Sequence, residues 1–243
     1  MANVQSAGIE PTARRLTLAI DIGGTGLKAS VVDEAARMVT ERVRVPTPVG
    51  APPQEIVKLL VGMVAPLAPF DRVSVGFPGV VRDGRVRTAP NLGNDQWQGY
   101  ELARELDVAL GKPVRLANDA DLQGLAVISG TGVEMVITLG TGFGTGLYLD
   151  GRLGPHLEIS HHPFRHGETY DQQLGNAARK AIGGTRWNKR VKKAIGNLRR
   201  LTNFDHLYIG GGNARKIDFT LDPDVTVVSN EAGMKGGVAL WRY

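Results

Sequence analysis

The sequence contains no cysteine. Disulfide bonds, thiolate nucleophiles and cysteine-ligated zinc are therefore excluded for this chain. Histidine is also scarce, with 5 residues in the chain, but His156, His161, His162 and His166 fall close together. This group permits a metal site, although neither cysteine nor a fixed ligand spacing supports one.

The sequence also lacks a long hydrophobic run. No apolar stretch approaches the roughly 20 residues that a membrane-spanning helix requires. Residues 1–15, which include Glu10 and Pro11, contain no apolar segment of the kind found in secretory signals. With 42% hydrophobic and 22% charged residues, the composition is that of an ordinary globular protein. We therefore expect a soluble cytoplasmic protein without a membrane partner.

Acidic residues are missing from one long stretch of the chain. There is no Asp or Glu between Gln172 and Phe204, although the whole sequence has 24 acidic residues and a net charge of only +5. The cations of this stretch are Arg179, Lys180, Arg186, Lys189, Arg190, Lys192, Lys193, Arg199 and Arg200. Such a run is either a solvated helix face or a surface that binds a polyanion, and the sequence leaves both interpretations open.

Strand and helix patterns are mixed along the first half, which predicts an α/β fold. A strand over residues 16–22 leads into the turn Gly23-Gly24-Thr25-Gly26, and a second strand returns over residues 27–32. The patterns also predict strands over 38–45, 73–77 and 114–117, and helices over 53–65, 100–110 and 121–128.

The second half repeats this opening device. An apolar run over 135–139 is followed by the glycine turn of residues 140–144 and a short strand over 147–149. The later predicted elements are helices near 172–182 and 186–201, strands over 206–209 and 225–228, and a final helix from about Glu231. Two copies of strand, glycine turn and strand predict two related lobes, each offering one turn to a shared cleft.

Glycine turns suit phosphate binding, because glycine permits positive φ angles and a close approach of backbone N–H groups to anionic oxygens. Two common phosphate motifs are excluded by spacing. The P-loop pattern is absent, since the Gly111-Lys112 pair runs into Pro113. A dinucleotide fingerprint requires a helix after the turn, whereas both turns here lead into strand-like runs.

Five further positions are candidates for chemistry. Asn118 and Asp119 follow the strand at 114–117, the place where α/β sheets present ligands. Asp119 could accept the proton of an attacking hydroxyl, and its alternative role is to cap the following helix. Asp21 could hold Mg²⁺ beside phosphates or cap its turn. Glu158 and His161, three residues apart, could bind sugar hydroxyls.

The ordered set of motifs resembles the ROK family of bacterial sugar kinases and repressors, and within it the polyphosphate glucokinase branch. The resemblance covers nearly all of the chain from Leu16 onward. Its motifs are Asp21-Ile22-Gly23-Gly24-Thr25-Gly26-Leu27-Lys28, Asn118-Asp119-Ala120-Asp121, Leu139-Gly140-Thr141-Gly142-Phe143-Gly144, Glu158-Ile159-Ser160-His161 and Gly210-Gly211-Gly212-Asn213.

The resemblance implies an actin/hexokinase-like (ribonuclease H-like) α/β fold with two lobes around a central cleft. We assign residues 16–118 with 230–243 to the smaller lobe and residues 119–229 to the larger one. The activity it implies is transfer of a phosphoryl group from polyphosphate, or ATP, to the 6-hydroxyl of glucose, with Mg²⁺ and in a homodimer.

The family motifs also imply a role for each candidate residue. Asp119 matches the catalytic base, and the sugar ligands are Asn91, Asn118, Asp119, Glu158, His161 and Asp171. The phosphate turns are matched by Asp21, Gly23, Gly24, Thr25, Lys28, Gly140, Thr141 and Gly142. Gly211 and Gly212 match a turn near the nucleotide base, while Lys192 and Lys193 of the basic stretch are our candidates for holding polyphosphate.

The sequence departs from the family at several points. Most ROK proteins carry a cysteine-rich zinc site. Because this chain has no cysteine, the resemblance does not imply structural zinc here. Asp171 stands where the family has a second sugar-binding glutamate, and Ser160 replaces the glycine usual before the histidine.

Three alternatives to a polyphosphate glucokinase follow from the resemblance. One is a strictly ATP-dependent glucokinase or other hexose kinase, and another is a sugar sensor without catalysis. A repressor that reads DNA would carry an additional helix-turn-helix domain, whereas only about 15 residues precede the first strand, so we expect no nucleic-acid partner.

Overall fold

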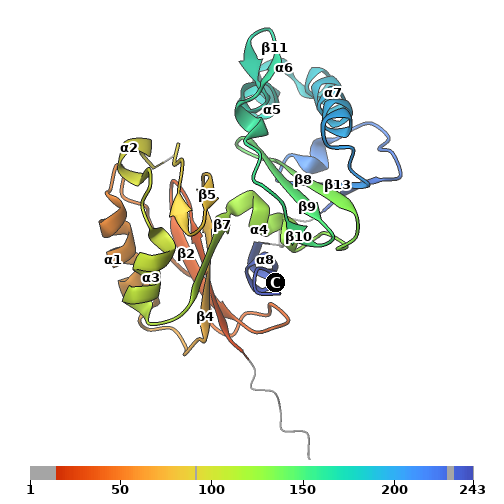
Figure 1. The fold of residues 1–243 in the computed structure, drawn as a ribbon. Coiled ribbons are helices and arrows are strands. Elements are labelled where there is room, and N and C mark those ends of the chain that lie inside the picture. Colours follow the sequence, from red (N-terminus) through yellow and green to blue (C-terminus); the bar gives the residue numbers. More distant parts are fainter. Residues whose placement is uncertain (1–14, 91, 229–232, 243) are drawn as a thin grey trace, which may run out of the picture.

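The computed structural model describes residues 15–90, 92–228 and 233–242. These residues form two five-stranded sheets that lie next to each other, each with its own layer of helices (Figure 1). Within the described residues, no helix is both long enough and apolar enough to cross a membrane.

The first sheet has the strand order β3-β2-β1-β4-β7. Its strands are β1 (Thr17–Ile22), β2 (Leu27–Val32), β3 (Val43–Val45), β4 (Arg72–Phe77) and β7 (Val114–Asn118). The strands β1, β2 and β3 form an antiparallel meander, whereas β4 and β7 run parallel to β1. Ile22 pairs with Leu27, so the first glycine turn closes the β1–β2 hairpin.

The second sheet repeats this topology in the order β10-β9-β8-β13-β14. Its strands are β8 (Val133–Leu139), β9 (Phe143–Leu149), β10 (Arg152–Leu153), β13 (His206–Gly210) and β14 (Val225–Val227). An antiparallel meander is again followed by two strands parallel to the first. The duplication predicted from the two glycine turns is therefore present in the strand order of the two sheets.

Helices cover the outer side of each sheet. They are α1 (Pro53–Val64), α2 (Asn94–Trp97) and α3 (Leu102–Leu110) on the first, and α5 (Tyr170–Leu174), α6 (Asn176–Ile182) and α7 (Gly184–Thr202) on the second. Two short hairpins, β5 (Val81–Arg82) with β6 (Arg85–Val86) and β11 (Pro163–Arg165) with β12 (Glu168–Thr169), complete the described strands. The short 3₁₀ helices span Ile159–His161 and Ala214–Lys216.

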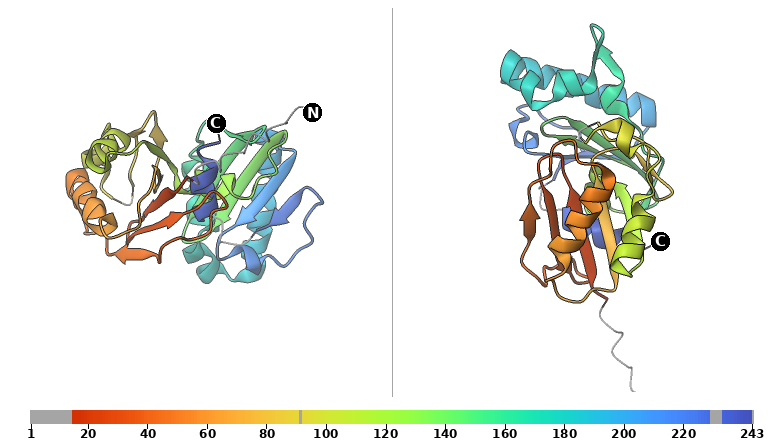
Figure 2. Two further views of the ribbon diagram at one scale, coloured as in Figure 1. Left: turned by 90° about the horizontal axis from the view of Figure 1, so that it is seen from below. Right: turned by 90° about the vertical axis from the view of Figure 1, so that its left-hand side faces the viewer.

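Two further helices, α4 (Asp119–Leu125) and α8 (Gly233–Ala239), lie between the sheets (Figure 2). They contact each other, while α8 also contacts β1 and β4 and α4 contacts β8 and β9. Successive strand residues face opposite sides, so Met135 and Ile137 join the core under α7 whereas Val136 joins the one around α4 and α8. The second sheet is therefore buried on both faces. The lobe boundaries at 118/119 and 229/230 stay a proposal.

Several predicted elements differ in extent from those observed. The strand expected over 147–149 begins at Phe143, in β9. The helix expected over 172–182 is two helices, because Gly175 is extended, with a ψ of 166°, and ends α5. The strand expected over 38–45 is reduced to β3 and an isolated bridge between Val32 and Met38. The helix α4 begins at Asp119 rather than residue 121, since Asn118 caps it. The predicted start of the last helix at Glu231 lies outside the described residues.

Candidate active site

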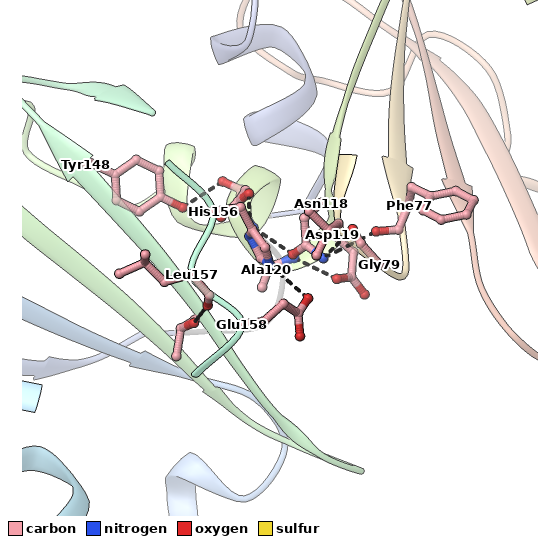
Figure 3. Close-up of polar contacts among 12 residues, drawn as sticks. Phe77, Gly79, Asn118, Asp119, Ala120, Tyr148, His156, Leu157 and Glu158 are labelled. Carbon is pink, nitrogen blue, oxygen red and sulfur yellow. Dashed lines mark hydrogen bonds and ion pairs between the residues drawn. The ribbon is translucent and has the colours of Figure 1, made fainter. Parts of the chain in front are cut away.

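Asn118 and Asp119 lie where β7 ends and α4 begins. The Asn118 side-chain oxygen accepts hydrogen bonds from the amides of Ala120, at 2.8 Å, and Asp121, at 3.3 Å. Its Nδ2 donates to the carbonyl oxygens of Phe77 and Gly79 at 3.4 and 3.1 Å. Asn118 thus joins the helix cap to the loop after β4 (Figure 3) and fixes the position of the next residue.

Close packing on β9 sets the depth of α4. A Cβ added to Gly124 would lie 1.8 Å from the Tyr148 hydroxyl oxygen, so only glycine allows this approach. The Tyr148 hydroxyl donates to the Asp121 carbonyl oxygen at 2.7 Å. The first turn of α4 is therefore held against the second sheet.

Asp119 has the perturbed titration expected of a catalytic group. Its Oδ1 accepts the Ala120 amide at 2.8 Å. Burial raises the pKa of Asp119 to about 6, and the carboxylates of Asp21 and Asp121 act in the same direction. A carboxylate with a raised pKa in a cavity is suited to accept a proton at neutral pH.

Two cavities meet at Asp119. The larger has a volume of about 600 Å³ and the smaller about 250 Å³, and Asp119 and Gln123 line both. The larger cavity brings together the predicted residues Asn118, Asp119, Glu158, His161, Asp171, Gly140, Thr141, Gly142 and Gly211. The smaller cavity adds Asp21 and Lys28.

Glu158 is oriented by three neighbours. His156 Nε2 lies 3.0 Å from Glu158 Oε1, and the Ser160 hydroxyl donates to Oε2 at 2.9 Å. His161 Nε2 lies 3.5 Å from the same Oε2. The His156 hydrogen bond lowers the pKa of Glu158, so this carboxylate is charged. Ser160, in the position where the family has glycine, therefore has a contact of its own.

The second glycine turn is braced from two sides. Its hairpin closes between Leu139 and Phe143. Asp171 Oδ1 accepts the Phe143 amide at 2.8 Å, and a Cβ at Gly142 would lie 2.2 Å from that oxygen. Asn213 Nδ2 donates to the Gly140 carbonyl at 3.1 Å. The sugar contact predicted for Asp171 stays a prediction beside this bond.

The first glycine turn is held by the Gly23 amide, which donates to the Gly26 carbonyl at 3.1 Å, and by Thr47, whose hydroxyl donates to the Gly23 carbonyl at 2.6 Å. Lys28 Nζ pairs with Asp21 Oδ2 at 2.7 Å, and these two residues face each other in the second residue pair from the turn. Asp21, just before this turn, and Asp119 line the same smaller cavity, so the turn begins beside the candidate base.

Several donor-side candidates stand apart from this cluster. Of the described candidates, Gly23, Gly24, Thr25, Gly212, Lys192 and Lys193 line neither cavity. Lys192 Nζ lies 5.9 Å from the ring centre of Phe219, and Lys193 Nζ lies 5.5 Å from that of Phe164. Asn91 lies outside the described residues.

In the part of the chain that the structure describes, no group of three or more His, Asp or Glu side chains is arranged to hold a metal ion. The four neighbouring histidines therefore form no such cluster there. Asp21 offers a single carboxylate, with Oδ2 already bound to Lys28. A single carboxylate is compatible with a Mg²⁺ site in which phosphate oxygens of the donor and water molecules supply most of the ligands.

Sequence reasoning missed two residues of the site, Asp121 and His156. His156 Nδ1 lies 2.8 Å from Asp121 Oδ2, although the two are 35 residues apart in the chain. The grouping of His156 with three other histidines was the available signal. Asn213, which braces the second turn, was visible only as the end of a glycine motif.

Comparisons with known proteins agree with this geometry. The ROK family profile matches residues 17–168. The polyphosphate glucokinase of Mycobacterium tuberculosis (strain CDC 1551 / Oshkosh) is 29% identical over 217 residues, which cover 85% of this chain and 81% of that protein.

Solved structures extend the likeness to the whole fold. The crystal structure of an inorganic polyphosphate/ATP-glucomannokinase from Arthrobacter sp. strain KM is 30% identical, with a TM-score of 0.79 over 92% of this chain and 97% of that one. A ROK family glucokinase from Streptomyces griseus, in complex with glucose and AMPPNP, has a TM-score of 0.67 at 22% identity, over 93% of this chain and 97% of that one.

The fold and site therefore define a two-lobed α/β protein of the actin/hexokinase-like class, as the sequence predicted. The chain belongs to the ROK family. The enzymes that match it are kinases, which confirms the prediction of a kinase.

Proposed function

We propose that this protein transfers the terminal phosphoryl group of inorganic polyphosphate to the 6-hydroxyl of glucose, with ATP as a second donor. The observation that carries the proposal is the position of Asp119, where the cavity holding Glu158 and His161 meets the one holding Asp21 and Lys28. We further propose that the enzyme is a cytoplasmic homodimer, on the strength of the family resemblance.

The proposed reaction begins with glucose in the larger cavity, where Glu158, His161 and Asn118 face its hydroxyl groups. Asp119 takes the proton of the 6-hydroxyl as that oxygen forms its bond to the terminal phosphorus. The bond between this phosphorus and its bridging oxygen breaks, and the shortened polyphosphate, or ADP, leaves with the electron pair. The second glycine turn offers N–H groups to the phosphate oxygens.

Mg²⁺ would be held beside Asp21 and would neutralise charge on the donor phosphates when bound. The residues of the chain do the rest. The Ala120 amide fixes Asp119 Oδ1, so Oδ2 is the oxygen presented to the hydroxyl. His156 and Ser160 orient Glu158 for the sugar.

The test is a coupled assay for glucose 6-phosphate with polyphosphate and with ATP in parallel, in the presence of Mg²⁺ and in excess EDTA. We expect product with both donors, a higher kcat/KM for polyphosphate, and no turnover in EDTA. Product from ATP alone would identify an ATP-dependent hexose kinase. Glucose binding without product from either donor would identify a sugar sensor.

A further inference from the structure

His156 is the buried histidine of the site. Its side chain is 10% exposed, whereas that of His161 is 62% exposed. It lies in the loop after β10, between the first turn of α4 and Glu158 (Figure 3). Its two ring nitrogens face two carboxylates, Asp121 Oδ2 at 2.8 Å and Glu158 Oε1 at 3.0 Å.

This geometry requires a particular protonation state. Ionised carboxylates only accept hydrogen bonds, and a neutral imidazole has a single N–H to donate. With both carboxylates ionised, both contacts are satisfied together only when both ring nitrogens carry a proton. Burial alone would lower the pKa of His156, but the hydrogen bonds to Asp121 and Glu158 outweigh it and raise the pKa to about 10.

Asp121 depends on this contact for its charge. Its side chain is 2% exposed, and among the described residues its Oδ1 has no hydrogen-bond partner. Burial raises the pKa of Asp121, and the bond to His156 opposes that shift. A buried carboxylate is tolerated when it is paired, and His156 supplies the pairing.

We propose that His156 is a positioning residue whose imidazolium ties Glu158 to α4, and so sets the distance between the sugar-binding carboxylate and the base Asp119. The inference rests on the proposed function, because it assigns Glu158 to the sugar. It adds a determinant of acceptor affinity: His156, which also lines the larger cavity, acts on the sugar through the position of Glu158.

Two neighbouring elements contribute the titratable groups around the imidazole of His156. Asp119 and Asp121 belong to α4, while Glu158 and His161 belong to its own loop and the 3₁₀ turn that follows. The three carboxylates favour the imidazolium, and Asp121 and Glu158 do so by direct contact. At pH 8 an imidazole with an ordinary pKa of about 6.5 would be neutral.

The experiment compares His156→Asn and His156→Gln with His166→Asn as the matched control. His166 is exposed and has a φ of 53°, which asparagine tolerates. We expect both His156 variants to raise the glucose KM roughly ten- to hundredfold, as loss of a charged hydrogen bond does. The decrease in kcat should be smaller, the polyphosphate KM should stay within about twofold, and the control should match the parent.

NMR of the imidazole nitrogens keeps the test decisive where a variant fails to fold. We expect His156 of the parent to be an imidazolium at pH 8. In Asp121→Asn, His156 should lose its proton at a lower pH than it does in the parent, because one of its two carboxylate partners has been removed. A neutral His156 in the parent at pH 8 would overturn the inference, as would an unchanged glucose KM in folded variants. A parent that phosphorylates no hexose refutes the proposed function, and with it the role at the sugar, while the NMR titration reports separately on the bridge.

Discussion

Asp119 combines two opposing influences on a carboxylate. It lies in the first turn of α4, where the helix dipole favours a negative charge. Burial nevertheless raises its pKa to about 6, with Asp21 and Asp121 adding to the effect. The result is a carboxylate that is ionised at neutral pH and still basic enough to accept a hydroxyl proton in the transition state.

The first prediction is kinetic. Asp119→Ala should decrease kcat by a factor on the order of 10²–10⁴, with a smaller effect on glucose binding, because the base acts in the transition state. In the parent, kcat/KM should rise with pH and level off above about 6, where Asp119 is ionised. Initial rates across pH 4.5–8 test both points, and a near-normal kcat in the variant would remove Asp119 from the mechanism.

The second prediction concerns stability, and its sign follows from linkage. The pKa of Asp119 is raised from 3.8 to about 6 on folding, so its ionisation weakens the folded state as pH rises through this window. Asp119→Asn should therefore increase the free energy of unfolding at pH 7–8 by on the order of 1–2 kcal/mol. Urea denaturation at pH 7.5 and pH 3.5 measures this, and an equal effect at both values would contradict the assignment.

Residues that act through local sequence patterns could be predicted, and residues that act through tertiary contacts could not. Asn118 and Asp119 follow a strand, and Glu158 and His161 lie three residues apart, so the sequence alone made them candidates, and all four line the larger cavity. Asp121 and His156 become neighbours only when α4 packs on β9 through Gly124. No periodic pattern in the sequence indicates that these two residues lie in contact.

At the scale of elements, α7 separates into a buried and a charged face. Its buried face carries Trp187, Val191, Ala194 and Leu198, and its exposed face carries Lys189, Lys192 and Lys193. Arg199 is tied to Asp222 and Asp224. Both interpretations of the acid-free stretch thus remain consistent with the fold, because a solvated face and a polyanion surface have the same helix pattern.

The third prediction separates these two interpretations. Lys192→Glu with Lys193→Glu should raise the polyphosphate KM several-fold and affect the ATP reaction less, because a long polyanion extends beyond the catalytic turns. The polyphosphate KM of the parent should also rise steeply with salt, while the glucose KM hardly changes.

A matched control for this charge reversal is Lys58→Glu with Lys112→Glu. Lys58 lies in α1, and Lys112 follows the end of α3, so both belong to the first half of the fold. This control changes the net charge equally but leaves α7 intact. Equal small effects of the two double variants would mean that the basic face of α7 only aids solubility.

The sequence of most elements along the chain and their duplication could be predicted, because the glycine turns and strand patterns recur in both halves. The strand order within each sheet was not predicted. The ends of the elements were less accessible, as Gly175 shows by dividing a helix whose pattern runs on without a break. At the scale of the whole molecule, the family resemblance groups residues 230–243 with residues 16–118, and α8 does contact β1 and β4 of the first sheet.

This long-range contact places the C-terminal segment between the two halves of the fold. The Ser74 hydroxyl donates to the Gly237 carbonyl at 2.6 Å, and Trp241 Nε1 donates to the Ser74 hydroxyl oxygen at 2.8 Å. Arg115 Nη1 donates to the Leu240 carbonyl at 2.6 Å. The guanidinium groups of Arg72 and Arg115 lie 5.3 and 4.6 Å from the Trp241 ring centre. Because α8 packs on α4, these contacts also support the helix that carries Asp119.

The fourth prediction follows from that arrangement. Trp241→Ala removes a hydrogen bond, two cation–π contacts and packing area, so it should decrease the free energy of unfolding by about 2–3 kcal/mol. Trp241→Phe keeps a ring between the arginines and loses the N–H, so its effect should be about half as large. Arg104→Ala, at an exposed residue of α3, is the control and should change stability by less than about 0.5 kcal/mol. Urea denaturation of the three variants is the measurement. Equal stability of Trp241→Ala and the parent would show that Trp241 contributes nothing to the stability of the fold, whereas the predicted order would show that it holds the C-terminal segment on the first sheet.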